Sequence, residues 1–150
     1  MKKISTFVTA LALFFSASAF TPKTDEPVVN PIVQQAFQKE FTGAKQVSWE
    51  KKEDLYFARF LNNQIKTEVA YNENGDLIAT SQTIQSSQLP LAASMAFKSK
   101  FEGYTAATTA TEVNYEKETH YYLTASNEKQ IVKLKISASG EITVESKKRI

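Results

Sequence analysis

The sequence has no cysteine, a single histidine and only four glycines among its 150 residues. Without cysteine the chain has no disulfide, no thiolate metal ligand and no cysteine nucleophile. One histidine excludes a two-histidine mechanism and a histidine-rich metal cage. The glycines lie too far apart in the sequence to build a phosphate-binding loop. We therefore predict no catalytic residue, no metal site and no cofactor, and we expect that the protein is not an enzyme.

The composition is otherwise that of a globular protein, with 42% hydrophobic and 23% charged residues. The formal net charge is +2. No basic surface for nucleic acid is indicated, so we expect no nucleic-acid partner.

The N-terminus has the three parts of a secretory signal peptide in the right order. Lys2 and Lys3 form a basic start, an apolar run covers residues 7–15, and Ala17 and Ala19 provide the small-x-small cleavage pattern. Cleavage after Ala19 leaves 131 residues with 16 basic and 16 acidic side chains. The apolar run is shorter than the roughly 20 residues that span a bilayer. We predict a periplasmic or secreted protein with no stable membrane insertion after cleavage.

The rest of the chain repeats itself, which is the main clue to its architecture. One group of residues recurs 60 positions later: Val33, Phe37, Phe41 and Gly43 correspond to Ala93, Phe97, Phe101 and Gly103. After an insertion of about six residues the offset becomes 65 and pairs Gly75 with Gly140. We predict a signal peptide over 1–19, a linker over 20–30 and two repeats over 31–87 and 88–150.

Each repeat has the pattern of one helix followed by four strands. Asn30-Pro31 and Leu89-Pro90 are typical helix starts, and apolar residues then recur at a spacing of four. Gly43 and Gly103 are placed to end these helices with a positive φ. Beyond them apolar residues alternate with polar ones, as in half-buried strands, and Asn74-Gly75 predicts a hairpin turn. The fold class is α+β: two helix-plus-meander units, with the helices covering one face of a sheet that the units share or of two separate sheets.

Period-two alternation also predicts what lies on the sheet face opposite the helices. Phe57 and Arg59 in the first repeat, and Tyr122 and Ile131 in the second, point away from the helices. Aromatic and arginine side chains dominate binding hot spots, whereas exposed apolar residues on a sheet can also serve only cross-strand packing. The candidate partner-binding residues are Phe57, Arg59, Tyr122 and Ile131, together with Tyr104 as a loop residue.

Two stretches carry a resemblance to a known family. The run from Phe37 to Ala44, followed by Val47-Ser48-Trp49-Glu50, and the run from Val69 to Asp76 resemble the PepSY-like family of exported Bacteroidetes proteins. That family is similar to the β-lactamase inhibitory protein. The resemblance implies two helix-plus-four-strand units, a periplasmic or secreted location, and a role in binding or inhibiting another protein. The second repeat departs from the family pattern, with Tyr115 in place of Trp49. The β-lactamase inhibitory protein contains disulfides, whereas this chain has no cysteine, so inhibition of a β-lactamase does not carry over.

Three functions remain compatible with the sequence. The first is an exported protein-binding module, or an inhibitor of an envelope or secreted protein, that uses the helix-free sheet face or the end loops. The second is a carrier of a small apolar or peptide ligand in the concavity of the sheet. The third is a structural protein that associates with itself, so a monomer and a weak homodimer both remain open. His120 lacks a second histidine or a cysteine, and it is expected to be a surface residue at the start of a strand.

Overall fold

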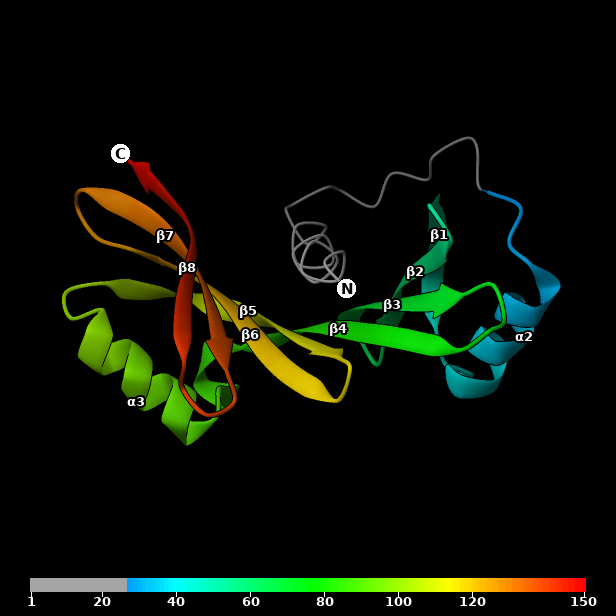
Figure 1. The fold of residues 1–150 in the computed structure, drawn as a ribbon, viewed down its shortest axis with the longest axis horizontal. Coiled ribbons are helices and arrows are strands. Elements are labelled where there is room, and N and C mark those ends of the chain that lie inside the picture. The colour runs from blue at the N-terminus through cyan, green and yellow to red at the C-terminus, as the bar shows by residue number, and fades with distance from the viewer. Residues whose placement is uncertain (1–26) are drawn as a thin grey trace, which may run out of the picture. The chain divides into compact units, whose positions relative to one another are not determined.

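The computed structural model describes residues 27–150, and the predicted signal peptide lies outside this range. The fold is α+β, with two α-helices and an eight-stranded antiparallel sheet whose strands follow chain order (Figure 1). The chain divides into two compact units, one ending at Gln82 and one comprising Thr83–Ile150, referred to below as unit 1 and unit 2.

Unit 1 begins with helix α2, Pro31–Glu40, followed by strands β1 (Lys45–Lys52), β2 (Leu55–Asn62), β3 (Ile65–Asn72) and β4 (Leu77–Gln85). The side chain of Asn30 caps the helix, because its Oδ1 accepts a hydrogen bond of 2.9 Å from the N–H of Ile32. Pro31 occupies the first turn, where its missing N–H costs nothing. The helix start predicted from Asn30-Pro31 is therefore confirmed.

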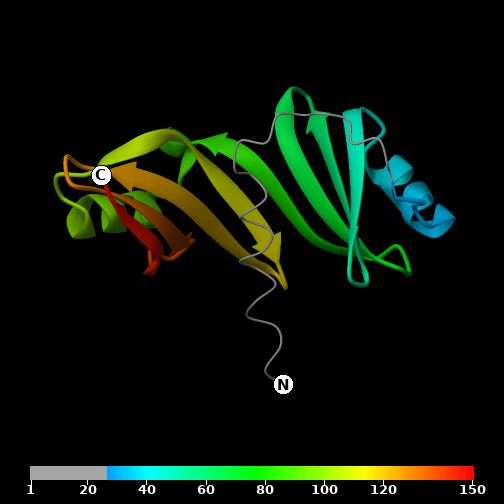
Figure 2. The same cartoon turned by 90° about the horizontal axis from the view of Figure 1, so that it is seen from above.

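Unit 2 contains the end of β4, a 3₁₀ turn (Ser86–Gln88) and helix α3, Leu91–Lys100. Strands β5 (Thr105–Tyr115), β6 (Glu118–Ser126), β7 (Gln130–Ser137) and β8 (Ile142–Arg149) follow, each antiparallel to the next. Figure 2 shows α3 on one side of these strands.

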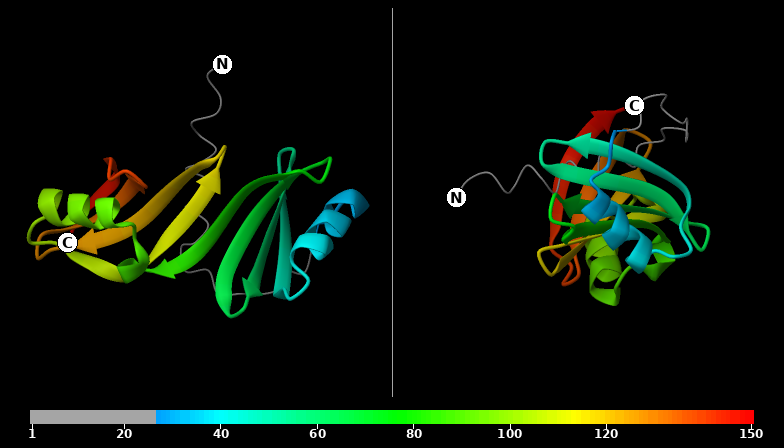
Figure 3. Two further views of the ribbon diagram at one scale, coloured as in Figure 1. Left: turned by 90° about the horizontal axis from the view of Figure 1, so that it is seen from below. Right: turned by 90° about the vertical axis from the view of Figure 1, so that its right-hand side faces the viewer.

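Each helix covers one face of the strands in its own unit. In unit 1 the aromatic ring of Phe37 lies edge-on to Trp49 and to Phe60, with ring centroids 5.2 and 5.0 Å apart. The core of unit 1 surrounds Phe37 and contains further buried residues of α2, β2 and β3, namely Val33, Tyr56, Ala58, Phe60, Val69 and Tyr71. In unit 2 the buried core consists of Ala93, Phe97, Ala110, Tyr121, Leu123, Ala125, Val132, Leu134 and Ile136. Figure 3 shows α2 lying along one side of the strands of unit 1.

Glycine turns hold the last hairpin of each unit against the first turn of its helix. Gly75 has φ +80°, and a Cβ there would lie 3.0 Å from Ile32 Cγ2. Gly140 has φ +91°, and its Cβ would lie 2.7 Å from the carbonyl oxygen of Ala92. Both positions therefore need glycine for its backbone conformation and for the close approach of the helix.

The helix ends differ from the sequence prediction in one respect. Gly103 has φ +79°, as expected, whereas Gly43 does not adopt a positive φ. The left-handed residue near Gly43 is Gln46, with φ +55°, at an irregularity between Lys45 and Ser48 in the pairing of β1 with β2. The chain turns after α2 at Thr42 and Gly43, where the N–H of Ala44 donates to the carbonyl oxygen of Phe41 at 3.1 Å, without a left-handed glycine.

Candidate functional site

The helix-free face of unit 1 is the sheet face opposite α2. Strand register places two rows of side chains on it, each crossing β1 to β4: Ser48, Arg59, Glu68 and Ser81 in the first row, and Glu50, Phe57, Ala70 and Ala79 in the second. The alternation predicted from the sequence is thus correct, because Phe57 and Arg59 lie on this face while Tyr56 and Ala58 pack with the helix.

Most of this face is nevertheless buried. Phe57 is only 3% exposed, although it belongs to neither of the core clusters that pack on the helices. Arg59 is half-buried. In this conformation Phe57 offers a partner almost no surface, and Arg59 offers only part of its side chain.

Arg59 lies between two carboxylates on this face. Its Nη2 donates to Glu50 Oε2 at 3.0 Å, and its Nε donates to Glu68 Oε2. Glu68 is fully buried, and burial raises the pKa of its carboxyl although Arg59 opposes the shift. Among the described residues, Glu68 Oε1 and the hydroxyl of Ser81 have no hydrogen-bond partner. Arg59 is thus the main compensation for a buried carboxylate, and nothing in the described chain satisfies the second carboxylate oxygen.

The helix-free face of unit 2 is more accessible and carries a different charge. Ile131, Lys133 and Lys135 alternate along β7 with Val132, Leu134 and Ile136, which are buried against the α3 side. Ile131 is 36% exposed, and Tyr122 lies directly opposite Lys135 in the neighbouring strand. Thr124, Thr143, Ser146 and Lys148 share this face. Two of the predicted binding residues, Tyr122 and Ile131, therefore share this face, on neighbouring strands and four residues apart in register.

Two titratable groups near this face have shifted pKa values. Burial, followed by the nearby carboxylate of Glu145, raises the pKa of Tyr122 to about 12, so its hydroxyl remains a hydrogen-bond donor at neutral pH. Burial and then Lys135 lower the pKa of His120, and Glu118, 3.9 Å from its ring, only partly opposes this. His120 is thus held toward its neutral form.

Tyr104 lies apart from these residues. It directly precedes β5 and packs on the core of unit 2, with its ring 5.5 Å from the ring of Phe101 in an edge-on arrangement. Its hydroxyl accepts a hydrogen bond from Gln130 Nε2. The structure therefore gives Tyr104 a packing role on the α3 side, away from the helix-free face.

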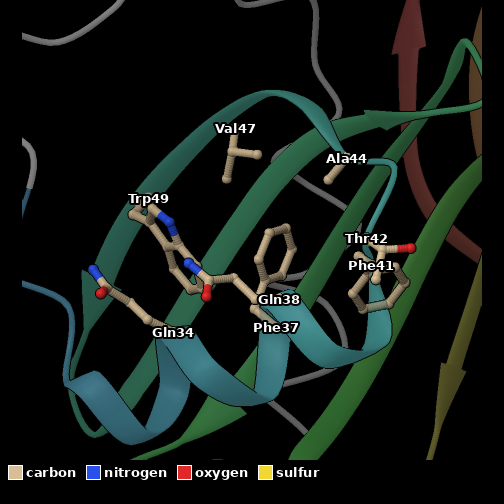
Figure 4. A pocket seen from close by; sticks show the side chains of 8 residues that line it. All are labelled: Gln34, Phe37, Gln38, Phe41, Thr42, Ala44, Val47 and Trp49. Atoms are coloured by element: carbon tan, nitrogen blue, oxygen red, sulfur yellow. The ribbon is translucent and has the colours of Figure 1, made fainter.

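A groove between α2 and β1 is the feature that the sequence analysis did not identify. It has a volume of about 480 Å³ and is lined by Gln34, Phe37, Gln38, Phe41, Thr42, Ala44, Val47 and Trp49 (Figure 4). Trp49 is the only tryptophan in the protein. The sequence signal for it was the shared face of Val47 and Trp49, which indicates a core position but cannot show that the helix leaves space beside the strand.

Within residues 27–150 no group of histidine and carboxylate side chains has an arrangement that could hold a metal ion. No helix in that range is both long and apolar enough to cross a membrane.

Neither a protein-family model nor a curated protein sequence matches the chain. Solved structures do. A BLIP-like protein from Bacteroides fragilis is 22% identical, with 87% of each chain covered and a TM-score of 0.63. A candidate periplasmic protein from Bacteroides eggerthii is 18% identical over 83% of this chain and 91% of its own, with a TM-score of 0.68. A DUF2874 family protein from Bacteroides ovatus is 22% identical over 83% of this chain and 89% of its own, with a TM-score of 0.65.

These likenesses extend over most of each chain and confirm the family resemblance at the level of the fold. None of the three structures is described as that of an enzyme. At these identities the comparison establishes the fold, and function has to be argued from the surfaces of this chain.

Proposed function

We propose that this chain, which has the fold of BLIP-like and DUF2874 proteins, is an exported non-enzymatic module that binds another envelope or secreted protein. The observation that carries the proposal is the helix-free face of unit 2, where Tyr122 and Ile131 lie beside lysines on a surface that α3 does not cover. Such a mixture of aromatic, aliphatic and cationic groups is typical of protein-binding surfaces. Inhibition of the bound partner is part of the proposal, supported by the fold shared with a BLIP-like protein.

The predicted binding residues differ in how accessible they are to a partner. Because Phe57 is buried, replacing it would test stability as much as binding. Tyr122 and Ile131 are the better anchors to remove, since they lie on the accessible face of unit 2.

The experiment is affinity capture from the periplasmic and secreted fractions of the native host, using the purified exported protein as bait. The Y122A/I131A variant should lose a protein that the wild type enriches. The matched control is L91A/M95A. Leu91 and Met95 are 75% and 61% exposed on α3, so replacing them with alanine removes a similar apolar surface from another part of unit 2. Capture that is the same for all three baits, or lost equally in both variants, would refute binding by this face. A captured enzyme would then be assayed for inhibition.

A carrier of a small apolar ligand is the second candidate function, favoured by the groove between α2 and β1. Three aromatic rings, those of Phe37, Phe41 and Trp49, line this groove together with two glutamine side chains. The expected occupant is apolar with a polar end, as is usual for such sites. Since Trp49 is the only tryptophan, titration with a fatty acid or an aromatic amide should change its fluorescence. An unchanged emission spectrum at saturating probe would count against a carrier.

Three further points belong to this proposal. The protein is exported and its signal peptide is cleaved after Ala19. Residues 20–30 form a linker to the first repeat. The two repeats, 31–87 and 88–150, derive from a tandem duplication. Support for the duplication comes from the surroundings of two glycines: a Cβ at Gly75 would meet Ile32 and Ala36, and a Cβ at Gly140 would meet Ala92 and Ala96, the residues 60 positions later.

A further inference from the structure

We infer that the helix-free face of unit 2 recognises an acidic segment of a partner protein. The inference rests on the proposed protein-binding function and names the chemistry of the partner. Three features carry it: the placement of the lysines, the hydrogen-bonding character of the face, and its contrast with the equivalent face of unit 1.

The lysines form one cluster. Lys133 and Lys135 stand two residues apart on β7 and so point to the same side of the sheet. Lys148 on β8 is paired in register with Ile131, two residues before Lys133. In residues 27–150 none of these three lysines takes part in an ion pair. One carboxylate, that of Glu145, lies near Tyr122 of the neighbouring strand β6.

The face mainly offers hydrogen-bond donors around an apolar centre. Each ammonium group donates and cannot accept, and the hydroxyl of Tyr122 stays protonated at neutral pH. Lys135 is paired in register with Tyr122, so its aliphatic stem and the aromatic ring are cross-strand neighbours that add apolar surface to this face. Carboxylates on an extended or flat partner surface complement this pattern, and the apolar part distinguishes such a partner from a simple anion.

Unit 1 shows that the charge is a property of this face and not of the fold. Glu68 pairs with Ser81 on β4, just as Lys133 pairs with Ser146 on β8. Glu68 is fully buried and bonded to Arg59, whereas Lys133 is exposed. The two units thus place opposite charges at equivalent positions of the same fold: a buried carboxylate in unit 1 and an exposed ammonium group in unit 2.

The test measures binding of a labelled oligo-glutamate peptide to the full exported protein by fluorescence anisotropy, with oligo-glutamine as the neutral probe. We expect oligo-glutamate alone to bind, with an affinity that falls as salt is raised through about 0.15 M. The K133Q/K135Q variant should bind at least about tenfold more weakly. The K98Q/K100Q variant removes the same charge from exposed lysines of α3 and should keep the wild-type affinity. Thermal melting checks that both variants remain folded.

Several results would overturn the inference. Equal weakening in the two lysine variants would mean that only net charge matters. Binding of phosphatidylglycerol vesicles as tight as that of the peptide, and lost in K133Q/K135Q, would identify lipid headgroups as the ligand. A dimer seen by light scattering in the wild type and absent in that variant would make a second copy the occupant.

The host capture experiment separates this inference from the proposed function. A partner lost by Y122A/I131A but retained by K133Q/K135Q would refute the acidic segment while leaving protein binding intact. A partner that both variants retain would refute the acidic segment and the proposed binding by this face together.

Discussion

Arg59 is the residue on which the charge balance of unit 1 depends. It bonds Glu50 at the edge of the sheet and the buried Glu68 in the middle. A buried carboxylate is costly unless a cation accompanies it, and removing the cation leaves the full cost in place. The raised pKa of Glu68 shows that burial already outweighs the effect of Arg59.

We predict that Arg59→Met lowers the free energy of unfolding by about 2 kcal/mol at pH 7, less than for a fully buried pair because Arg59 is 32% exposed. Without Arg59 the pKa of Glu68 rises further. As pH falls through that raised value toward the ordinary 4.5, the carboxyl protonates in the folded state and the deficit shrinks. Urea unfolding at pH 7 and at pH 5 measures the change.

The double variant Arg59→Met/Glu68→Gln is the control for this prediction. It has no buried charge, so its stability relative to the wild type should vary much less between the two pH values. A deficit in Arg59→Met that is the same at both pH values would contradict the role of Glu68.

For single residues, the sequence predicts to which face of the sheet a side chain points better than it predicts how deeply that side chain is buried. Alternation correctly places Phe57 and Arg59 on the helix-free face, because side-chain direction along a strand is fixed by the backbone. It cannot predict that Phe57 is 3% exposed or that Glu68 is fully buried, since burial depends on what the tertiary structure brings near. Tyr104 was predicted as a loop residue that contacts a partner, but it packs on Phe101. That contact also depends on the tertiary structure, because it forms only after the chain has turned back from the helix.

Among the elements, the hairpins closed by glycine are the points where strand and helix meet. Gly140 lies under the first turn of α3, and Gly75 lies under the first turn of α2. In each case the nearest atoms come from the helix, so the turn fixes how far the last hairpin can move relative to it.

We predict that Gly140→Ala destabilises unit 2 by about 2–3 kcal/mol, because φ +91° is strained for alanine and the new methyl group meets the backbone oxygen of Ala92. Gly75→Ala should cost about 1–2 kcal/mol, since the side chain of Ile32 can move aside. Thermal unfolding followed by circular dichroism measures both.

Gly43→Ala is the matched control for the two turns. Nothing lies within 4 Å of a Cβ at this position, and its φ is not positive, so the change should stay within about 0.5 kcal/mol. If Gly43→Ala lowered the free energy of unfolding as much as Gly140→Ala, the requirement for glycine would not be specific to the two hairpin turns.

Local signals predict the elements well and their arrangement less well. Asn30-Pro31 marks the start of α2 because capping is decided within a few residues. The helix end near Gly43 was predicted wrongly in its backbone conformation, since the turn closed by the N–H of Ala44 and the carbonyl oxygen of Phe41 forms without a positive φ at Gly43. The groove beside Trp49 depends on how α2 packs across β1, which no local pattern records.

For the whole molecule, the sequence suggests export, and the residues that the structure describes, 27–150, all follow the predicted cleavage site. We predict that the protein recovered from the host envelope or medium begins at Phe20 and contains 131 residues, because Ala17 and Ala19 fit the cleavage pattern. Intact-mass spectrometry and N-terminal sequencing provide the measurement. Recovery of the 150-residue chain from the cytoplasm would contradict it.

Strand β8 has a consequence for how the protein behaves at high concentration. It comes last in the strand order, exposes seven of its eight residues, and ends in Lys147, Lys148 and Arg149. Like charges along such an edge repel the same edge of another molecule and so discourage strand-to-strand aggregation. Because dissolved ions screen this repulsion, the protein should be easier to concentrate in dilute buffer than in strong salt, and salt would favour its precipitation or crystallisation.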